Sequence, residues 1–173
     1  ELRKSNLQTP DPANPGFSIE TGESRSRGVE WDVGGRLTSH LNVTASYAYT
    51  KTKVTEANDN SYGNELYGVP RNGGKLFIRY DQQEGGATGY SVGLGAYAVS
   101  SQQGDVANSF QIPGYARADL MAQYKWLWSE SIMTAQLNLT NISDTEYYIA
   151  SGSRDEIAPG RPQALIASLR MEF

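Results

Sequence analysis

Two acidic side chains, Glu30 and Asp32, are two residues apart in "VEWD" and would share one face of a strand. A pair of carboxylates can act as general acid and general base in the hydrolysis of a glycosidic bond. Such a pair needs neighbouring polar groups to hold a sugar, and no polar cluster in the surrounding sequence marks a substrate site. Pairing with Arg36, or with a domain packed against this face, explains the two carboxylates better than catalysis, so we predict no catalytic residues here.

Other residue types associated with chemistry are scarce. His40 is the single histidine and the chain has no cysteine, so no zinc-site pattern is present and we expect no protein-metal ligands. The stretch "GGKLFIRY" lacks the spacing of a phosphate-binding loop. In "SRSRG", residues 24–28, two arginines are too few for a nucleic-acid surface, and we expect them to pair with acidic neighbours at the end of a strand.

Composition allows two broad classes of protein, a soluble protein and a membrane β-barrel. The chain has 173 residues, a formal charge of -4, 20% charged residues and a mean hydropathy of -0.54. These values exclude a disordered tail and a basic nucleic-acid binder, and they fit one domain. No apolar run approaches the roughly 20 residues of a membrane helix. A membrane β-barrel remains open, because its strands need only about 10 residues, half of them polar.

Alternation of apolar and polar residues recurs along the whole chain and predicts an all-β fold. In the sharpest case, "ARADLMAQYKW", Leu120 and Tyr124 fall on one face while Arg117 and Gln123 fall on the other. Phe77, in "KLFIRY", is an exception on a polar face. Counting a weaker opening strand, we predict eight strands, at residues 2–7, 29–37, 41–50, 75–80, 90–98, 116–126, 133–141 and 164–173.

The predicted connections alternate between short and long. Short turns are expected at 38–40, 82–89 and 127–131, and long loops at 8–27, 52–71, 100–114 and 143–163. In an antiparallel sheet this puts all long loops at one rim, as in the wall of an up-and-down barrel. Amphipathic rings on the apolar face gather near the short-turn rim, as expected for a membrane-interface girdle. These rings are Tyr80, Tyr90, Tyr124, Trp126 and Phe173.

Several stretches resemble the C-terminal part of TonB-dependent siderophore receptors of the ferrichrome and hydroxamate type. They are "NLQTPDPANPGFSIETGESRSRGVEWD", "LNVTASYAYTKTKVT", "GVPRN", "FQIPGYARADL", "NLTNISDTEYY" and the terminal strand. The resemblance implies an antiparallel transmembrane wall that is a fragment of an about 22-stranded barrel. Residues 1–173 would then be the C-terminal portion of the barrel, without the plug domain, in the outer membrane of a Gram-negative bacterium.

The resemblance also implies partners and a binding site. The chain would face outer-membrane lipid, adjoin the rest of the barrel and an N-terminal plug of the same receptor, and depend on TonB through an absent N-terminal region. Its ligand would be a ferric siderophore that keeps its own iron, so no cofactor is expected. Aromatic rings with a cation in the long loops suit such a chelate. The candidates are Tyr62, Tyr67, Phe110, Tyr147, Tyr148 and Arg154.

The end of the chain fits the same interpretation. Leu169, Met171 and Phe173 alternate toward a terminal aromatic carboxylate, which the resemblance identifies as a barrel-assembly signal. The family usually has an aromatic residue at the place of Met171, and an aromatic pair before a glycine where this chain has Ala158 and Pro159. Two alternatives stay open: a complete eight-stranded outer-membrane barrel with a structural or adhesive role, and a soluble β-sandwich that binds a ligand.

Overall fold

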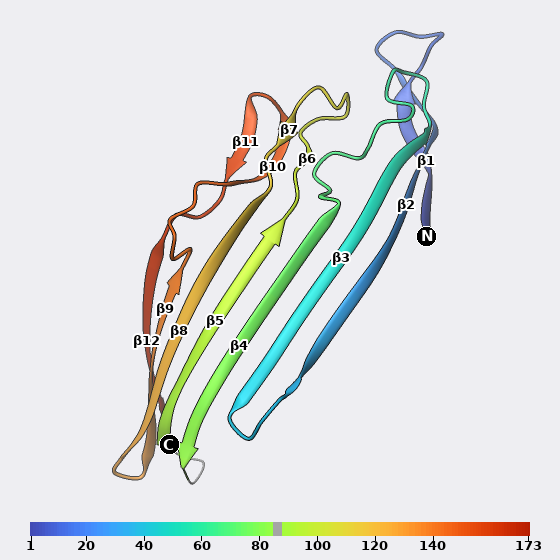
Figure 1. The fold of residues 1–173 in the computed structure, drawn as a ribbon. Helices are drawn as coiled ribbons and strands as arrows, with labels where there is room; N and C mark the ends of the chain where they lie inside the picture. Colours follow the sequence, from blue (N-terminus) through green and yellow to red (C-terminus); the bar gives the residue numbers. More distant parts are fainter. Residues whose placement is uncertain (85–87) are drawn as a thin grey trace.

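A computed structural model describes residues 1–84 and 88–173 as an open, tilted antiparallel sheet of eight strands (Figure 1). The strand order is β1-β2-β3-β4-β5-β8-β9-β12, so each strand pairs with its neighbour along the chain once the small loop strands are set aside. The bounds are β1 Leu2–Pro10, β2 Ser18–Arg36, β3 Leu41–Glu56, β4 Asn72–Glu84, β5 Thr88–Val99, β8 Tyr115–Trp128, β9 Ser131–Thr140 and β12 Ala164–Glu172. The predicted all-β fold and its eight strands are confirmed.

The first two strands are longer than predicted. Residues 8–27 were expected to form a long loop, but β1 and β2 pair from Leu2 opposite Ser26 to Pro10 opposite Ser18, which leaves only residues 11–17 as a connection. This hairpin is polar on both sides, and its Thr9 and Thr21 hydroxyls lie 2.9 Å apart in a hydrogen bond. Apolar and polar residues alternate only where one face of a strand meets an apolar medium. A strand that is polar on both faces lacks this pattern, so the sequence did not predict it.

The other long loops are confirmed at one end of the sheet, which is the upper end in Figure 1. β3 extends to Glu56, so the second loop begins later than expected. The next loop contains the small pair β6 Gln102–Gln103 and β7 Gln111–Ile112, and the last contains β10 Tyr148–Ser153 and β11 Glu156–Pro159. The short turns at 37–40 and 129–130 lie at the opposite end. Of the turn expected at 82–89, residues 85–87 fall outside the described part of the chain.

One face of the sheet is apolar and stays exposed. Large side chains at alternate positions have exposed fractions such as 57% for Trp31, 51% for Leu94 and 50% for Leu137. The predicted ring cluster near the short turns is confirmed: the Tyr80 and Tyr90 centroids are 6.3 Å apart, and Tyr124 stacks on Trp126 at 5.8 Å. A sheet with such a face needs an apolar medium or another layer against it. The described part of the chain holds no helix long and apolar enough to cross a membrane.

Hydrogen bonds between side chains run across the opposite, polar face. Asn42 donates to Asp81 at 3.0 Å, and Arg79 donates to Gln123 at 3.2 Å. Phe77 is the predicted exception on this face, and its ring lies against Gly93, where a Cβ would come within 2.7 Å of the ring. A glycine at that place therefore makes room for the aromatic side chain.

Two predictions about acidic and terminal residues have different outcomes. Glu30 and Asp32 lie on the polar face, but the ion pairs found among the described residues do not include the expected pairing with Arg36. Instead, both residues line a hollow on this face together with Lys75. Leu169 pairs in register with Ala135, and both Leu169 and Met171 are exposed on the apolar face. Their role in barrel assembly, with that of Phe173, stays a prediction.

Candidate functional site

A cavity of about 780 Å³ opens on the polar face near the long-loop end of the sheet. Three tyrosines line it: Tyr97 near the end of β5, Tyr115 at the start of β8, and Tyr147 from the loop that follows β9. Tyr97 and Tyr115 reach this face because they share strand parity with the polar residues Ser91 and Arg117. The cavity is therefore lined mainly by β5, β8 and the last long loop, with further residues from β4, β9 and β12.

Tyr147 is held in place by two contacts of its ring. Its ring stacks on Tyr115 with the centroids 4.1 Å apart, and only 8% of the residue is exposed. The ring also lies on Gly160, where a Cβ would come within 2.1 Å of a ring carbon. The Gly160 backbone N–H also donates to the Tyr147 carbonyl at 2.7 Å. A glycine is required at position 160 because any side chain would displace the tyrosine.

Arg117 is a cation that lies beside two of these rings. Its Nη1 donates to the Tyr147 hydroxyl at 3.1 Å, and its guanidinium carbon lies 5.8 Å from the Tyr97 ring centroid and 5.9 Å from that of Tyr147. Its Nη2 is 3.5 Å from a carboxylate oxygen of Asp119. The buried Nε has no hydrogen-bond partner among the described residues. A buried donor of this kind is costly unless a ligand or water accepts from it.

Further charges make the cavity electropositive. Lys75 and Arg161 also line it, and the Lys75 ammonium lies 5.7 Å from the Tyr97 centroid. With Arg117 there are three cations against the single carboxylate of Asp119 in the lining. Aromatic faces and cations can bind an oxygen-rich ligand, but they do not supply a nucleophile beside a base. The described residues contain no group of three or more side chains suited to hold a metal ion.

Asn141 anchors the loop that covers the cavity. The residue is fully buried and has a φ of 53°, in the left-handed region that asparagine tolerates. Its side-chain Nδ2 donates to the carbonyls of Thr145 at 3.0 Å and Arg161 at 3.3 Å, and its Oδ1 accepts from the Thr145 N–H at 3.0 Å. Its own N–H donates to Asp119 at 2.8 Å. Asn141 thus connects both ends of the last loop to β8.

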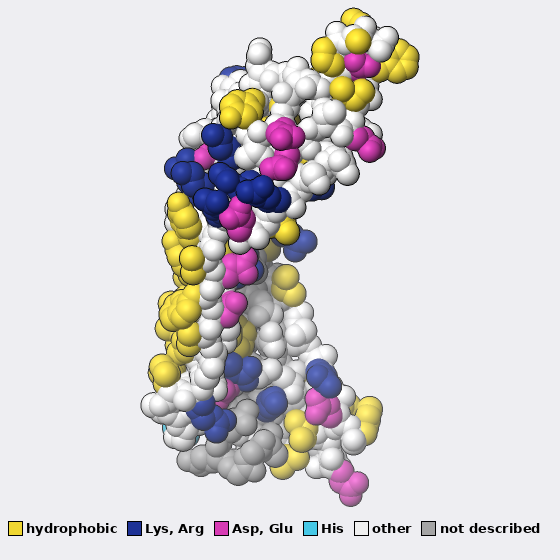
Figure 2. Space-filling model, turned by 90° about the vertical axis from the view of Figure 1, so that its right-hand side faces the viewer, with side chains coloured by type: hydrophobic (Ala, Val, Ile, Leu, Met, Phe, Trp, Pro, Cys, Tyr) yellow, Lys and Arg dark blue, Asp and Glu magenta, His cyan; other side chains and the backbone are white. Residues whose placement is uncertain are grey.

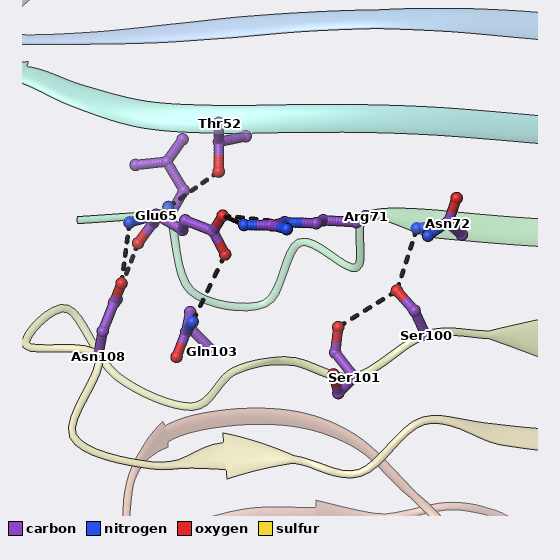
Figure 3. Close-up of polar contacts among 9 residues, drawn as sticks. Thr52, Glu65, Arg71, Asn72, Ser100, Ser101, Gln103 and Asn108 are labelled. Carbon is purple, nitrogen blue, oxygen red and sulfur yellow. Dashed lines mark hydrogen bonds and ion pairs between the residues drawn. The ribbon is translucent and has the colours of Figure 1, made fainter. Parts of the chain in front are cut away.

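The long loops also hold one another. Figure 3 shows Glu65, from the β3–β4 loop, paired with Arg71 and reached by Gln103 of the β5–β8 loop. Asn108 completes this contact, because its amide donates to the Glu65 carbonyl and its Oδ1 accepts from the Glu65 N–H, both at 2.9 Å. The hydrogen bond from Arg71 lowers the pKa of Glu65 below its ordinary value. We refer to Glu65, Arg71, Gln103 and Asn108 as the loop clamp.

The six sequence-predicted binding residues do not form one cluster. Tyr147 lies in the cavity, whereas its neighbour Tyr148 is 44% exposed. Arg154 and Phe110 do come together, with the guanidinium carbon 5.0 Å from the ring centroid, but this pair braces two loops, and Arg154 donates to the Ser109 carbonyl at 2.9 Å.

Tyr62 and Tyr67 are exposed in the β3–β4 loop, at 64% and 46%. Because no bound ligand tests them, the six binding assignments stay predictions.

The sequence interpretation missed the cavity residues Tyr97, Tyr115, Arg117, Lys75 and Arg161 as binding candidates. A signal was present for the first two. Each aromatic occupies polar-face parity in its strand, near the end that leads into a long loop. An aromatic residue that breaks the alternation there cannot serve the apolar band, so it indicates a contact inside the polar face. No comparable local signal marks Arg161, because only the fold of the last loop brings it to the cavity.

Comparisons with known proteins agree with this architecture. A family model described as TonB dependent receptor-like, beta-barrel, matches residues 1–142. The metal-pseudopaline receptor CntO of Pseudomonas aeruginosa is 35% identical over 173 residues, covering 99% of this chain and 24% of the relative. The ferrichrome outer membrane transporter/phage receptor of Escherichia coli is 34% identical, covering 99% of this chain and 23% of the relative. The chain therefore spans about a quarter of the length of these relatives.

Solved structures share the fold. The ferric preacinetobactin receptor BauA of Acinetobacter baumannii matches with a TM-score of 0.84 and 24% identity, over 96% of this chain and 25% of that one. The siderophore receptor PiuA of the same species matches with a TM-score of 0.81 and 26% identity, over 98% of this chain and 25% of that one. The eight-stranded sheet thus has the geometry of a segment of a larger barrel.

Proposed function

We propose that this chain, which belongs to the TonB dependent receptor-like β-barrel family, forms the C-terminal part of the wall of a receptor that takes up ferric siderophores or related metal complexes. The observation that carries the proposal is the cavity that Tyr97, Tyr115 and Tyr147 line together with the cation of Arg117. A chelate with its metal already enclosed offers apolar edges to the rings and oxygen atoms to the cations that line the cavity.

Family membership places the chain in the outer membrane of a Gram-negative bacterium. The apolar face is the lipid face and the polar face is the lumen, because strands of such barrels alternate between the two. The family and its relatives are receptors and transporters, so the chain is not an enzyme. The long loops form the outer rim, as they do in outer-membrane barrels.

A hydroxamate chelate is our finer proposal for the ligand. Asp119 partly neutralises Arg117, and the three rings supply much of the contact surface, so binding would depend more on ring contact than on net charge. This balance suits a weakly charged iron complex. The similarity to the ferrichrome transporter, at 34% identity, supports the same choice.

A more anionic metal complex is the second candidate. Lys75 and Arg161 line the cavity without a paired carboxylate within 4.0 Å among the described residues, and unpaired cations favour an anionic ligand. The relative at 35% identity is named for a metal-pseudopaline complex, so the relatives do not all bear hydroxamate names.

The remaining partners are proposals as well. The rest of the barrel would pair with the free edges of β1 and β12, because unpaired backbone groups are not tolerated in lipid. An N-terminal plug would close the lumen, and TonB would supply inner-membrane energy for its rearrangement. The metal would cross within its chelator, without protein ligands.

The test is chelate binding by the full-length receptor and by its Tyr147→Ala and Tyr147→Phe variants. Losing the ring should weaken binding by about 1 kcal/mol or more, which is about fivefold, whereas Phe keeps the ring and loses only the bond to Arg117. Fluorescence quenching by a ferric trihydroxamate and by a ferric tricatecholate would be measured side by side. The exposed neighbour Tyr148→Ala should have a smaller effect.

Equal affinity in native and Tyr147→Ala receptors, with intact heat-modifiable migration on gels, would remove this cavity from the binding site. Tighter binding of the tricatecholate than of the trihydroxamate would favour the anionic candidate. Absence of binding of either chelate by the native receptor would contradict the proposed ligand class.

A further inference from the structure

A group of cations lies on the lipid face at the outer end of the first three strands. The group, which we name the basic cluster, consists of Arg3, Arg25, Arg27, Lys51 and Lys53. They share strand parity with the apolar residues Val29 and Tyr49, and not with the lumen residues. Figure 2 shows dark blue side chains gathered directly above a column of hydrophobic side chains.

The strand registers put these cations side by side. Arg27 pairs with Lys51, Arg25 pairs with Lys53, and Arg25 also pairs with Arg3 of β1. The directly opposite positions of an antiparallel pair have Cβ atoms only about 5 Å apart, so like charges there repel one another. Three adjacent strands therefore carry like-charged pairs that add nothing to the stability of the sheet.

The basic cluster begins where the apolar band ends. The last apolar pair is Val29 with Tyr49, and the next pair on the same face is Arg27 with Lys51. Successive residues on one face of a strand are about 7 Å apart, so the change from apolar to cationic takes place within one step. This is the depth at which hydrocarbon gives way to headgroups, and Tyr49 has the amphipathic ring typical of that boundary.

Acidic neighbours compensate part of the charge, since Glu1 also acts on Arg25 and Glu65 acts on Lys51 at longer range. Glu1 lies 3.4 Å from Arg3 and 3.0 Å from Arg27, which are 62% and 58% exposed. Lys53 lies over the Tyr62 ring at 5.6 Å. Glu23 and Glu56 are at the next register step outward, and Glu23 accepts a hydrogen bond from Thr55 at 2.8 Å. Among the described residues, Arg25, Lys51 and Lys53 have no carboxylate within 4.0 Å.

We propose that the basic cluster binds the phosphate groups of lipid headgroups in the outward leaflet. The proposal rests on the lipid-face assignment made above and not on the identity of the chelate. Headgroup phosphates lie at the depth of the cluster and supply the anions that its like-charged pairs lack. Because the cations continue the lipid-facing band, a lipid whose chains pack against Val29 and Trp31 brings its headgroup to Arg27 and Lys51.

The test measures which lipid collects beside the cluster in the full-length receptor. Trp31, on the same face two steps below Arg27, serves as reporter in a variant that keeps no other tryptophan. The receptor is placed in phosphatidylcholine vesicles with a fixed fraction of lipid carrying brominated chains, attached either to phosphatidylglycerol or to phosphatidylcholine. Bromine quenches tryptophan fluorescence only at short range. The quenching by brominated phosphatidylglycerol divided by that by brominated phosphatidylcholine therefore measures how far the anionic lipid is enriched beside Trp31.

We expect severalfold stronger quenching by brominated phosphatidylglycerol with the native cluster, and a ratio near one after Arg25→Gln, Arg27→Gln, Lys51→Gln and Lys53→Gln are combined. The matched control removes four lumen-side cations, with Lys4→Gln, Arg36→Gln, Lys125→Gln and Arg170→Gln, and should keep the native ratio. If the fourfold cluster variant does not fold, the double variant Lys51→Gln and Lys53→Gln should give a ratio between the native value and one.

A native ratio near one would overturn the proposal, and so would enrichment that survives in the cluster variant. Equal loss in the lumen control would also overturn it, because net charge alone would then explain the effect. Absence of quenching by either lipid would refute the lipid-face assignment itself. Measuring chelate binding as well distinguishes this proposal from the proposed ligand. Chelate affinity should be unchanged in the cluster variant. Absence of chelate binding by the native receptor would contradict only the proposed ligand class.

Discussion

Replacing Asn141 with alanine should loosen the loop that covers the aromatic cavity and leave the sheet intact. The side chain is fully buried and makes three hydrogen bonds, two to carbonyls and one from the Thr145 N–H. One of the carbonyls belongs to Arg161, so this single residue connects the start of the loop to its end. Residues 143–160, including Tyr147, lie between these two attachments.

The expected magnitude follows from these contacts. Each bond contributes about 1 kcal/mol, so alanine should lower the free energy of opening the loop by about 3 kcal/mol. The φ of 53° adds about 1 kcal/mol for alanine, because a Cβ without a local hydrogen bond is strained in that region. Asn141→Gly removes the same bonds without the strain, so the difference between the two variants separates the two causes.

Amide hydrogen exchange in the folded full-length receptor measures the effect. The total of about 4 kcal/mol in Asn141→Ala should speed exchange of the protected amides in residues 143–160 by about a thousandfold, and the loss of about 3 kcal/mol in Asn141→Gly by more than a hundredfold. The Gly160 amide, which donates to the Tyr147 carbonyl, is a suitable reporter. Ser143→Ala, at an exposed position of the same loop, is the control. Unchanged loop exchange in Asn141→Ala would refute the anchoring role, and faster exchange throughout β8 and β9 would show that the residue supports the sheet instead.

Two further predictions concern the lipid face and the loop clamp. Leu137→Arg should block stable membrane insertion, because a cation on the lipid face costs about 2 to 4 kcal/mol near the midplane, whereas Gln123→Arg on the lumen face should be mild; equal sensitivity in a folding assay would contradict the face assignment. Because Arg71 lowers the pKa of Glu65, the stabilisation from the clamp is present above the unfolded pKa near 4.5 and is lost as pH falls through the lower folded value. Exchange of the β3–β4 loop should therefore accelerate, beyond its intrinsic pH dependence, only at acid pH, and Glu65→Gln should remove that dependence.

The strands of the sheet could be predicted because the alternation of apolar and polar residues is visible within each strand's own sequence. In β8, alternation assigns Leu120 and Tyr124 to one face and Arg117 and Gln123 to the other, and the register with β5 confirms it. A strand between lipid and lumen must alternate, so the pattern follows directly from its surroundings. The same reason explains the failure at residues 8–27, where β1 and β2 pair outside the apolar band.

The candidate site could be predicted only in part, because its residues come from separate elements. Tyr147 was identified from its loop, but its partners Tyr115 and Gly160 are 32 and 13 residues away and meet it only after the last loop folds back over the sheet. Arg154 and Phe110 illustrate the opposite case: both residues suit a ligand, yet they contact each other. Residue type indicates what a side chain can bind, and the fold determines whether another residue already occupies that contact.

The two proposals rest on particular exceptions to the alternation. Tyr97 and Tyr115 are aromatic residues on the lumen face, and Arg25 and Arg27 are cations on the lipid face. Both kinds of exception occur near the long-loop end of the strands, where the requirement for lipid contact ceases. Regular alternation is what the membrane demands of any barrel, so it says nothing about the ligand. A residue that departs from it without destabilising the wall must contact something other than hydrocarbon, which is why the rings are assigned to a chelate and the cations to lipid phosphate.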